Sequence, residues 1–485
     1  MNGQGSGDLE VPNLRRVLGQ RDLVLLFIVA VANLNVVPAV AASGPLTVWL
    51  WMAALILFFW PQGIAVIELS HRYPGEGGVY LWSKEIFGDF HGFLSGWCYW
   101  TNNVFYIPTL LFYIVGISVY IGGARFAALG NNRVFVAALA LLLLWVIVWL
   151  NIRGLGVGKW VNNIGGIGTV ITAAVLVGLA AALWHLFGLR VQAREFRVAG
   201  ADWHLVSSFG VICFGLVGLE LASVMGDEIR DPRRTLPGAV AWGGIASGML
   251  YVGATLAVLL ALPQKDINVV QGILQAVTRM ASEVGVGWFV PPVALLLTLA
   301  IAGTTSAWLS GSARIPFVAG LDRYLPPVLG RIHPRHRTPY VALIVHAILS
   351  CIFVAMSFVG ATVEQAYEIL LLLAVVLQLV PFLYVYAALI RIAMREDLGG
   401  AFYGRRTLWF AGISGFATTA TGMVVAFVPP AGRQEATWLF ETKMLIGCAF
   451  FLGLAAFFFY VYSRRKNRED AHAGAIESRV RGESV

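Results

Sequence analysis

The chain has few charged residues for its length. Only 12% of its 485 residues are Asp, Glu, Lys or Arg, whereas 58% are hydrophobic and the mean hydropathy is +0.76. This composition excludes an ordinary soluble globular protein, because the polar surface is too small to cover the apolar residues. We therefore expect a polytopic membrane protein.

Cysteine and clustered metal ligands are also scarce. The four cysteines fall in apolar segments without metal-binding spacing, which predicts free, buried thiols and no disulfide framework: Cys98, Cys213, Cys351 and Cys448. His185, His204 and His346 stand singly, without acidic partners at ligand spacing. We therefore expect no metal, no cofactor and no membrane-embedded enzyme. No charged repeat or filter loop indicates a channel.

The basic residues are spread over short loops and the C-terminal tail. A net charge of +8 without one basic domain argues against a nucleic-acid partner. Residues 1–21 lack an apolar signal-peptide core, so no removable signal peptide is expected. Twelve apolar segments follow, at 22–43, 47–70, 87–122, 134–151, 160–188, 204–226, 237–262, 287–319, 339–356, 363–392, 407–429 and 437–462. With both termini cytoplasmic, 25 of the 34 Lys and Arg residues face inside, as expected for the cell's inner membrane.

Two of these segments carry helix-breaking residues. Asn33, Asn35 and Pro38 predict a break between Ala32 and Val36 in the first segment, although a proline kink in a continuous helix is the alternative. In the sixth, Gly215 and Gly218 lower helix propensity on both sides of 216–217.

The corresponding places of the two breaks indicate an inverted repeat of five plus five helices with a binding site at the membrane midplane. This organisation predicts a cytoplasmic tail at 1–21, a ten-helix core at 22–392, helices 11 and 12 within 393–462, and a charged, partly disordered cytoplasmic tail at 463–485. The outside loop 263–286 has helical apolar spacing and predicts a lid-like surface segment.

Several polar groups would lie at membrane depth. Glu220 follows the second break, where the high energetic cost of a carboxylate indicates a functional role that its protonation is expected to control. The alternative is a neutral, hydrogen-bonded structural residue. Asn103 and Tyr106 in the third segment could face the same cavity or only tie helices together. The turn 68–78 could close an inward gate through ion pairs or could simply be solvated.

Three motifs resemble one transporter family. They are ELSHRYPGEGGVYLW at 68–82, GLELASVMGDEIRDPRRTLPGA at 218–239 and AWLSGSARIPFVAGLDRYLPPVLGRIHPRHRTP at 307–339. Over nearly the whole chain, the sequence resembles the amino acid/polyamine/organocation (APC) transporters. In spacing it is most similar to the glutamate/GABA antiporter branch, through EGGVYLW at 76–82, LPQKDINVVQG at 262–272 and FVPP at 427–430.

The resemblance implies an all-α membrane protein of 12 transmembrane helices. Its fold would be the 5+5 inverted repeat of the bacterial leucine transporter, with discontinuous helices 1 and 6 and alternating access. It implies an aromatic gate at Phe214, a proton-linked glutamate at Glu220, a substrate-contacting asparagine at Asn103 and an inner-gate tryptophan at Trp308. The sequence departs from many relatives at 31–35, where a Gly-Ser-Gly run is missing. A mid-membrane lysine of proton-coupled relatives is also missing near Thr169, which favours exchange over lysine-dependent symport.

The four half-helix ends suit an amino acid, because N–H groups of the second halves face a carboxylate and carbonyls of the first halves face an ammonium. The expected function is exchange of amino acids or related amines. Polyamine uptake is the alternative, but it requires several cavity carboxylates, and Glu364 and Glu368 lie near the outer end of segment 10. Expected partners are the small-molecule substrate and the bilayer, with a homodimer as a possible assembly. The predicted substrate-binding residues are Asn33, Leu34, Asn35, Asn103, Phe214, Gly215, Gly218, Glu220 and Trp308.

Overall fold

The described part of the chain is a bundle of helices. A computed structural model describes residues 19–188, 203–224, 229, 232–356, 363–395, 398–429 and 437–482. The elements of the first half are α1 (Gln20–Val31), η1 (Leu34–Val36), α2 (Val37–Ala41), α3 (Thr47–Ala54), η2 (Leu55–Phe59), α4 (Trp60–Arg72), α5 (Val79–Phe87), α6 (Asp89–Ser118), η3 (Val119–Gly122), η4 (Ala124–Asn131), α7 (Arg133–Ile152) and α8 (Leu155–Phe187). They are followed by α9 (Trp203–Gly215), α10 (Leu221–Val224), α11 (Pro232–Ala261), η7 (Gln264–Asp266), α12 (Gly272–Glu283), η8 (Gly287–Phe289), α13 (Val290–Ser312), α14 (Arg314–Leu321), η9 (Pro327–Gly330), α15 (Tyr340–Met356), α16 (Val363–Ala393), α17 (Arg405–Val425) and α18 (Thr437–Gly482).

Ten helical segments within the described ranges are long and apolar enough to cross a membrane. All twelve predicted segments coincide with helical residues, but the sixth is divided after Gly215 and the ninth, α15, has 17 residues. Large apolar side chains cover the outer surface. Trp60 and Trp242 are both 68% exposed, which suits contact with hydrocarbon rather than water. The all-α polytopic fold is confirmed, whereas the count of twelve spans stays a prediction.

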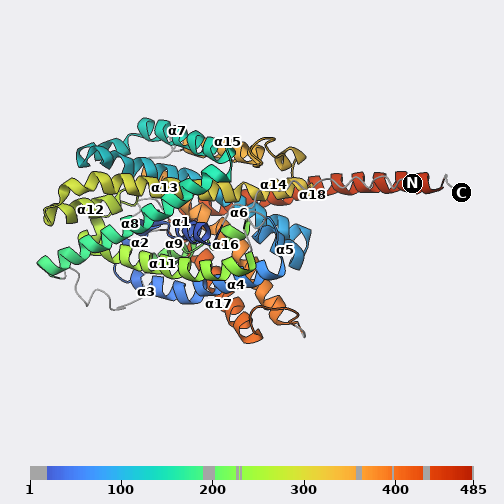
Figure 1. The fold of residues 1–485 in the computed structure, drawn as a ribbon, viewed down its shortest axis with the longest axis horizontal. Helices are drawn as coiled ribbons and strands as arrows, with labels where there is room; N and C mark the ends of the chain where they lie inside the picture. The colour runs from blue at the N-terminus through green and yellow to red at the C-terminus, as the bar shows by residue number, and fades with distance from the viewer. Residues whose placement is uncertain are drawn as a thin grey trace.

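The interrupted helices lie in the middle of the bundle. Figure 1 shows α1, α9 and α16 near its centre, with α7 and α15 along one side and α3, α4 and α17 along the other. Helix α1 packs against α8, α11 and α13, while α16 packs against α6 and α17. The α8–α13 contact is close because Gly165 faces Gly303, where a Cβ on either residue would come within 2.7 Å of the other backbone. The bundle therefore encloses both breaks on several sides.

Two peripheral segments test the sequence expectations. In the loop 263–286, which was predicted to lie outside, α12 is helical, and its Ile273, Leu274 and Val277 are fully buried against the bundle. The charged tail was expected to be partly disordered, but α18 continues as one helix to Gly482 and extends beyond the bundle (Figure 1). Its many Glu, Arg and Ala residues favour helix, and Lys466 donates a 3.2 Å hydrogen bond to the Tyr324 hydroxyl. Residues 1–18 of the predicted N-terminal tail lie outside the described ranges, and the division into a ten-helix core and two further helices stays a prediction.

All four cysteines are free. The expectation that all four are buried is wrong for Cys351, which is partly exposed on α15, next to the 52%-exposed Ile352. An apolar span places such a residue toward lipid as readily as toward the core.

Candidate functional site

The first break falls where the asparagines predicted it. Helix α1 ends at Val31, and Ala32 and Asn33 leave the helical region with ψ angles of 65° and 79° before the η1 turn. The Asn33 side chain donates to the Ala30 carbonyl at 2.9 Å, the local bond that favours leaving the helix. The first segment is therefore interrupted rather than a continuous helix with a proline kink.

The second break follows Gly215 and directly meets the first. Helix α9 ends at Gly215 and α10 begins at Leu221. Between them Gly218 has a φ of +142°, which L side chains rarely adopt. A Cβ at Gly218 would lie 2.8 Å from the Ala30 carbonyl, so the unwound backbone rests on the end of α1. At Gly215 a Cβ would come 2.9 Å from the Val36 side chain, so space is limited at both predicted glycines.

Glu220 is fully buried at the second break. Its Oε2 atom accepts from the Gly218 N–H at 2.9 Å and from Gln62 at 3.4 Å, and Oε1 accepts from the Tyr99 hydroxyl at 3.1 Å. The carboxyl group thus joins the unwound segment to α4 and α6. A charge-bearing group buried in this way needs such donors.

One face of α6 lies along the breaks. Tyr99, Asn103 and Tyr106 are spaced four and three residues apart, so their side chains share a face of the helix. Tyr99 contacts Glu220, and the Tyr106 hydroxyl donates to Asn35 Oδ1 at 3.2 Å. Asn103 lies between them, fully buried. Its Nδ2 donates to the Tyr99 carbonyl at 2.9 Å, while its Oδ1 has no hydrogen-bond partner among the described residues.

Aromatic rings surround the same place. The ring of Tyr106 lies edge-on to Phe214, with centroids 4.9 Å apart, and to Trp308 at 6.1 Å. The Trp308 indole N–H donates to the Ala30 carbonyl at 3.2 Å. The structure therefore gathers Asn35, Phe214 and Trp308 around Tyr106.

Leu34 and Asn35 form the short turn after the first break, and both are buried. Leu34 offers only its backbone to a polar ligand. Asn35 is held from α16, because the Tyr367 hydroxyl donates to its carbonyl at 2.9 Å. Across the break, Asn33 Oδ1 is a buried oxygen with no hydrogen-bond partner among the described residues. Both side-chain polar atoms of Asn35 therefore have hydrogen-bond partners, whereas Asn33 keeps one buried oxygen without a partner among the described residues.

All nine predicted site residues are buried, so the site is closed to solvent in this structure. A hollow of about 850 Å³ lies elsewhere, between α3, η2, α4 and α11. None of the nine residues lines it, and only Leu219 brings the second break to its wall. Its lining is apolar and includes the exposed Trp60 and Met249, so it lacks the polar groups that an amino acid requires.

Ion pairs lie at one end of the bundle. Glu76, in the turn after α4, lies 3.1 Å from the Arg314 guanidinium, and the side chains are 8% and 2% exposed. Arg314 also donates to the carbonyl and, at 3.0 Å, to the hydroxyl of Ser310 at the end of α13. In the same turn the Gly77 N–H donates to the Val224 carbonyl of α10 at 3.2 Å. The turn is therefore not simply solvated, because it contacts both Arg314 at the start of α14 and Val224 of α10.

A second contact joins α5 to the residue after α14. Lys84 lies 2.6 Å from Asp322, and the Tyr80 hydroxyl donates to the same carboxylate at 2.5 Å. Burial, followed by the Asp322 charge, raises the pKa of Tyr80 above its usual value, so the phenol stays a neutral donor. Both contacts lie on the side predicted to be cytoplasmic.

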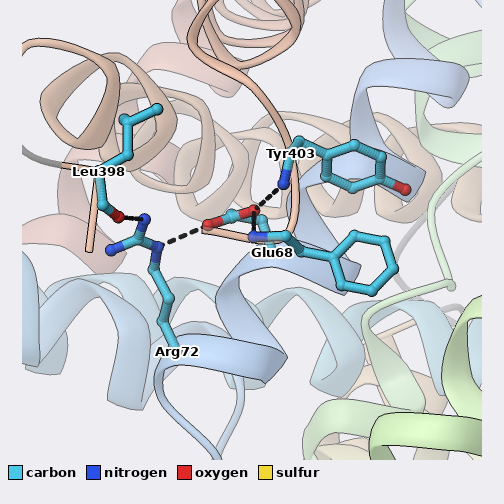
Figure 2. Close-up of polar contacts among 5 residues, drawn as sticks. Glu68, Arg72, Leu398 and Tyr403 are labelled. Carbon is cyan, nitrogen blue, oxygen red and sulfur yellow. Dashed lines mark hydrogen bonds and ion pairs between the residues drawn. The ribbon is translucent and has the colours of Figure 1, made fainter. Parts of the chain in front are cut away.

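A third polar cluster lies at the same end, at the end of α4. Figure 2 shows Glu68 between Arg72 and the loop that precedes α17. Glu68 accepts from Arg72 Nε at 2.5 Å and from the backbone N–H groups of Phe402 and Tyr403 at 2.9 and 3.0 Å, while Arg72 also donates to the Leu398 carbonyl. The pair thus anchors this loop to α4.

Sequence reasoning missed four residues of the site, of which one is Tyr99 of α6, a partner of Glu220. Tyr251 of α11 contacts both breaks, Tyr367 of α16 holds Asn35, and Gln62 of α4 contacts Glu220. The available signal for Tyr251 was its place well inside a membrane span, away from the interfaces where tyrosines are usually enriched. No spacing connects Gln62, Tyr251 or Tyr367 to the breaks.

The chain is similar to known transporters over most of its length. The family model described as "Amino acid permease" matches residues 18–468. An uncharacterized transporter of Legionella pneumophila is 28% identical over 452 residues, 90% of this chain and 95% of that protein. An uncharacterized transporter of Mycobacterium tuberculosis is 26% identical over 376 residues, 76% and 80% of the two chains. A probable agmatine/putrescine antiporter of Lactococcus lactis is 24% identical over 322 residues, 66% and 67% of the two chains. With two interrupted helices that meet inside an apolar bundle and a family match across nearly all its residues, the chain belongs to the amino acid permease family and is a transporter of the APC superfamily.

Proposed function

We propose that this transporter exchanges amino acids or closely related amines by alternating access, with the substrate bound where the two helix breaks meet. The observation that carries the proposal is the contact between the breaks, where Gly218 rests on the Ala30 carbonyl beside buried amide and aromatic groups. We further propose that the protein lies in the inner membrane with both termini cytoplasmic. The absence of catalysis, of a resident cofactor and of a nucleic-acid partner, a homodimeric assembly, and membership of the glutamate/GABA branch stay predictions.

The polar atoms around the breaks suit an ammonium group. Tyr251 has one hydroxyl proton for the carbonyls of both Val31 and Gly215, so one of these half-helix ends retains acceptor capacity. The unpartnered oxygens of Asn33 and Asn103 are further acceptors. Carbonyls at such ends favour cations. The first break offers asparagines rather than glycines to a carboxylate, so amines are as well suited as α-amino acids.

Glu220 is the proposed proton-coupling group. It bonds to the unwound segment, to α4 and to α6, so a change in its protonation would alter contacts among three elements that surround the substrate. The same contacts also suit a structural cap of the break. Because the two roles differ in pH dependence, the pH–rate profile separates them.

Polyamine transport is the second candidate. It is favoured by the relative named as an agmatine/putrescine antiporter, and that name also supports exchange. The scarcity of acids opposes it: among the described residues, Glu220 is the carboxylate with contacts at the breaks. A diamine needs a partner for each ammonium.

The proposal is tested by reconstituting the protein into proteoliposomes that are preloaded with substrate or left empty. Labelled glutamate, GABA, arginine, agmatine and putrescine are offered outside. Exchange predicts uptake of one or more labels that is much faster into vesicles preloaded with the same compound. Equal uptake with and without preloading would establish uniport instead, and no uptake of any label would refute the substrate class.

A further inference from the structure

The end of α1 is capped by the Asn33 side chain of the break and by side chains from other helices. The last carbonyls of a helix have no partner within it. Here Thr304 donates to the Val29 carbonyl at 3.0 Å, Asn33 and Trp308 donate to that of Ala30, and Tyr251 donates to that of Val31. Among these donors, the Tyr251 hydroxyl also reaches the other break.

Tyr251 contacts both breaks through one oxygen. Its hydroxyl lies 2.5 Å from the Gly215 carbonyl at the end of α9 and accepts the Asn33 N–H at 2.9 Å. Its ring is stacked on Trp51 of α3, with centroids 4.3 Å apart and an angle of 20° between the planes. Both side chains are fully buried. One stacked pair therefore connects α1, α3, α9 and α11.

The hydroxyl lies between the carbonyl ends of two interrupted helices. Carbonyls at the ends of broken membrane helices commonly coordinate a cation or the substrate. Here a neutral hydroxyl holds two such ends together, and the covalent link to α11 prevents it from dissociating.

We propose that Tyr251 is a positioning residue that joins the two helix breaks, so that α1 and α9 move as one unit during transport. Without the hydroxyl, the Val31 and Gly215 carbonyls lose the donor that they share, and the Asn33 N–H loses an acceptor. The breaks then move independently, and the carrier can return without bound substrate. The consequence for substrate exchange rests on the proposed function, whereas the connection between the two breaks through Tyr251 can be tested without a substrate.

The substrate-free test is amide hydrogen exchange of the purified full-length protein, followed by mass spectrometry. Y251F should speed amide hydrogen exchange by about tenfold in peptides across both breaks, 28–37 and 212–220, because the Asn33 N–H loses an acceptor and the Val31 and Gly215 carbonyls lose their shared donor. T304V removes a donor from α1 alone and should affect only the first peptide. Y113F is the matched control, since Tyr113 is fully buried and its hydroxyl has no hydrogen-bond partner among the described residues.

Faster amide hydrogen exchange at only one break in Y251F, or at neither, would refute the proposed connection between the breaks. Y251F that fails to purify as a monodisperse protein is replaced by Y251L and Y251M, which also lack a donor and for which the same two-break pattern is required. In proteoliposomes, Y251F should raise the ratio of uptake into empty vesicles to uptake into preloaded vesicles several-fold, whereas Y113F should not. Equal losses of both rates would indicate a purely structural role and contradict the positioning role. If the wild type transports none of the compounds, the proposed function fails, but the hydrogen-exchange result still decides whether Tyr251 connects the two breaks.

Discussion

The ion pair between Glu76 and Arg314 gives the most quantitative prediction. E76Q removes one charge of a pair whose Arg314 side chain is 2% exposed. Breaking a buried ion pair costs about 3–5 kcal/mol, and the lower value applies here because Ser310 still accepts two hydrogen bonds from Arg314. About 3 kcal/mol corresponds to roughly a 100-fold increase in the population of the form open at this end.

The assay is the reaction of a single reporter cysteine with a membrane-impermeant thiol reagent. Ser223 is suitable because it is 5% exposed and lies beneath the turn that carries Glu76, so S223C in a cysteine-free background reports opening. E76Q should speed labelling by about 100-fold. E283Q is the control, since its Arg279 partner is 44% exposed and such pairs contribute at most about 1 kcal/mol. The charge swap E76R/R314E should restore protection in part. Equal labelling in E76Q and its parent, or equal acceleration in E283Q, would refute the assignment of this pair as a closing contact.

Three further predictions concern other groups. E220Q should flatten the pH dependence of exchange between about pH 5 and 8 while keeping measurable transport; identical profiles in proteoliposomes would return Glu220 to a structural role. E68Q should lower the thermal unfolding temperature, because both Glu68 oxygens accept from Arg72 or from loop N–H groups; an unchanged melting curve would show that this cluster adds no stability. A cysteine-free variant should transport at the wild-type rate, and an oxidant should affect the transport rates of the two proteins equally. Oxidant inhibition of the wild type alone would contradict the absence of a redox role. The replaced residues are Cys98, Cys213, Cys351 and Cys448.

The sequence predicted both helix breaks because their causes are local. Asn33 bonds to the backbone three residues earlier, and Gly218 adopts a φ that its own lack of a Cβ permits. Such effects need no knowledge of the rest of the fold. The apolar length of the segments likewise predicted the membrane bundle.

The residues that complete the site depend on contacts between distant segments. Tyr251 lies 218 positions after Asn33, and Tyr367 lies 332 positions after Asn35. A tyrosine within an apolar segment shows that a partner is needed, but not which one. The tail of α18 shows the opposite case, since its charge predicted disorder while its helix-forming residues allowed the helix to continue.

The central claim is that substrate binds where the two breaks meet, and the Michaelis constant for exchange in F214A and F105A tests it most directly. Both residues are buried phenylalanines, 4% and 1% exposed, but Phe214 lies beside the breaks whereas Phe105 packs on Phe353 and Phe451. An aromatic contact with substrate contributes about 1–2 kcal/mol, so F214A should raise the constant roughly 5- to 30-fold, whereas F105A should leave it unchanged. An unchanged constant in F214A, or an equal rise in both variants, would contradict the placement of the substrate.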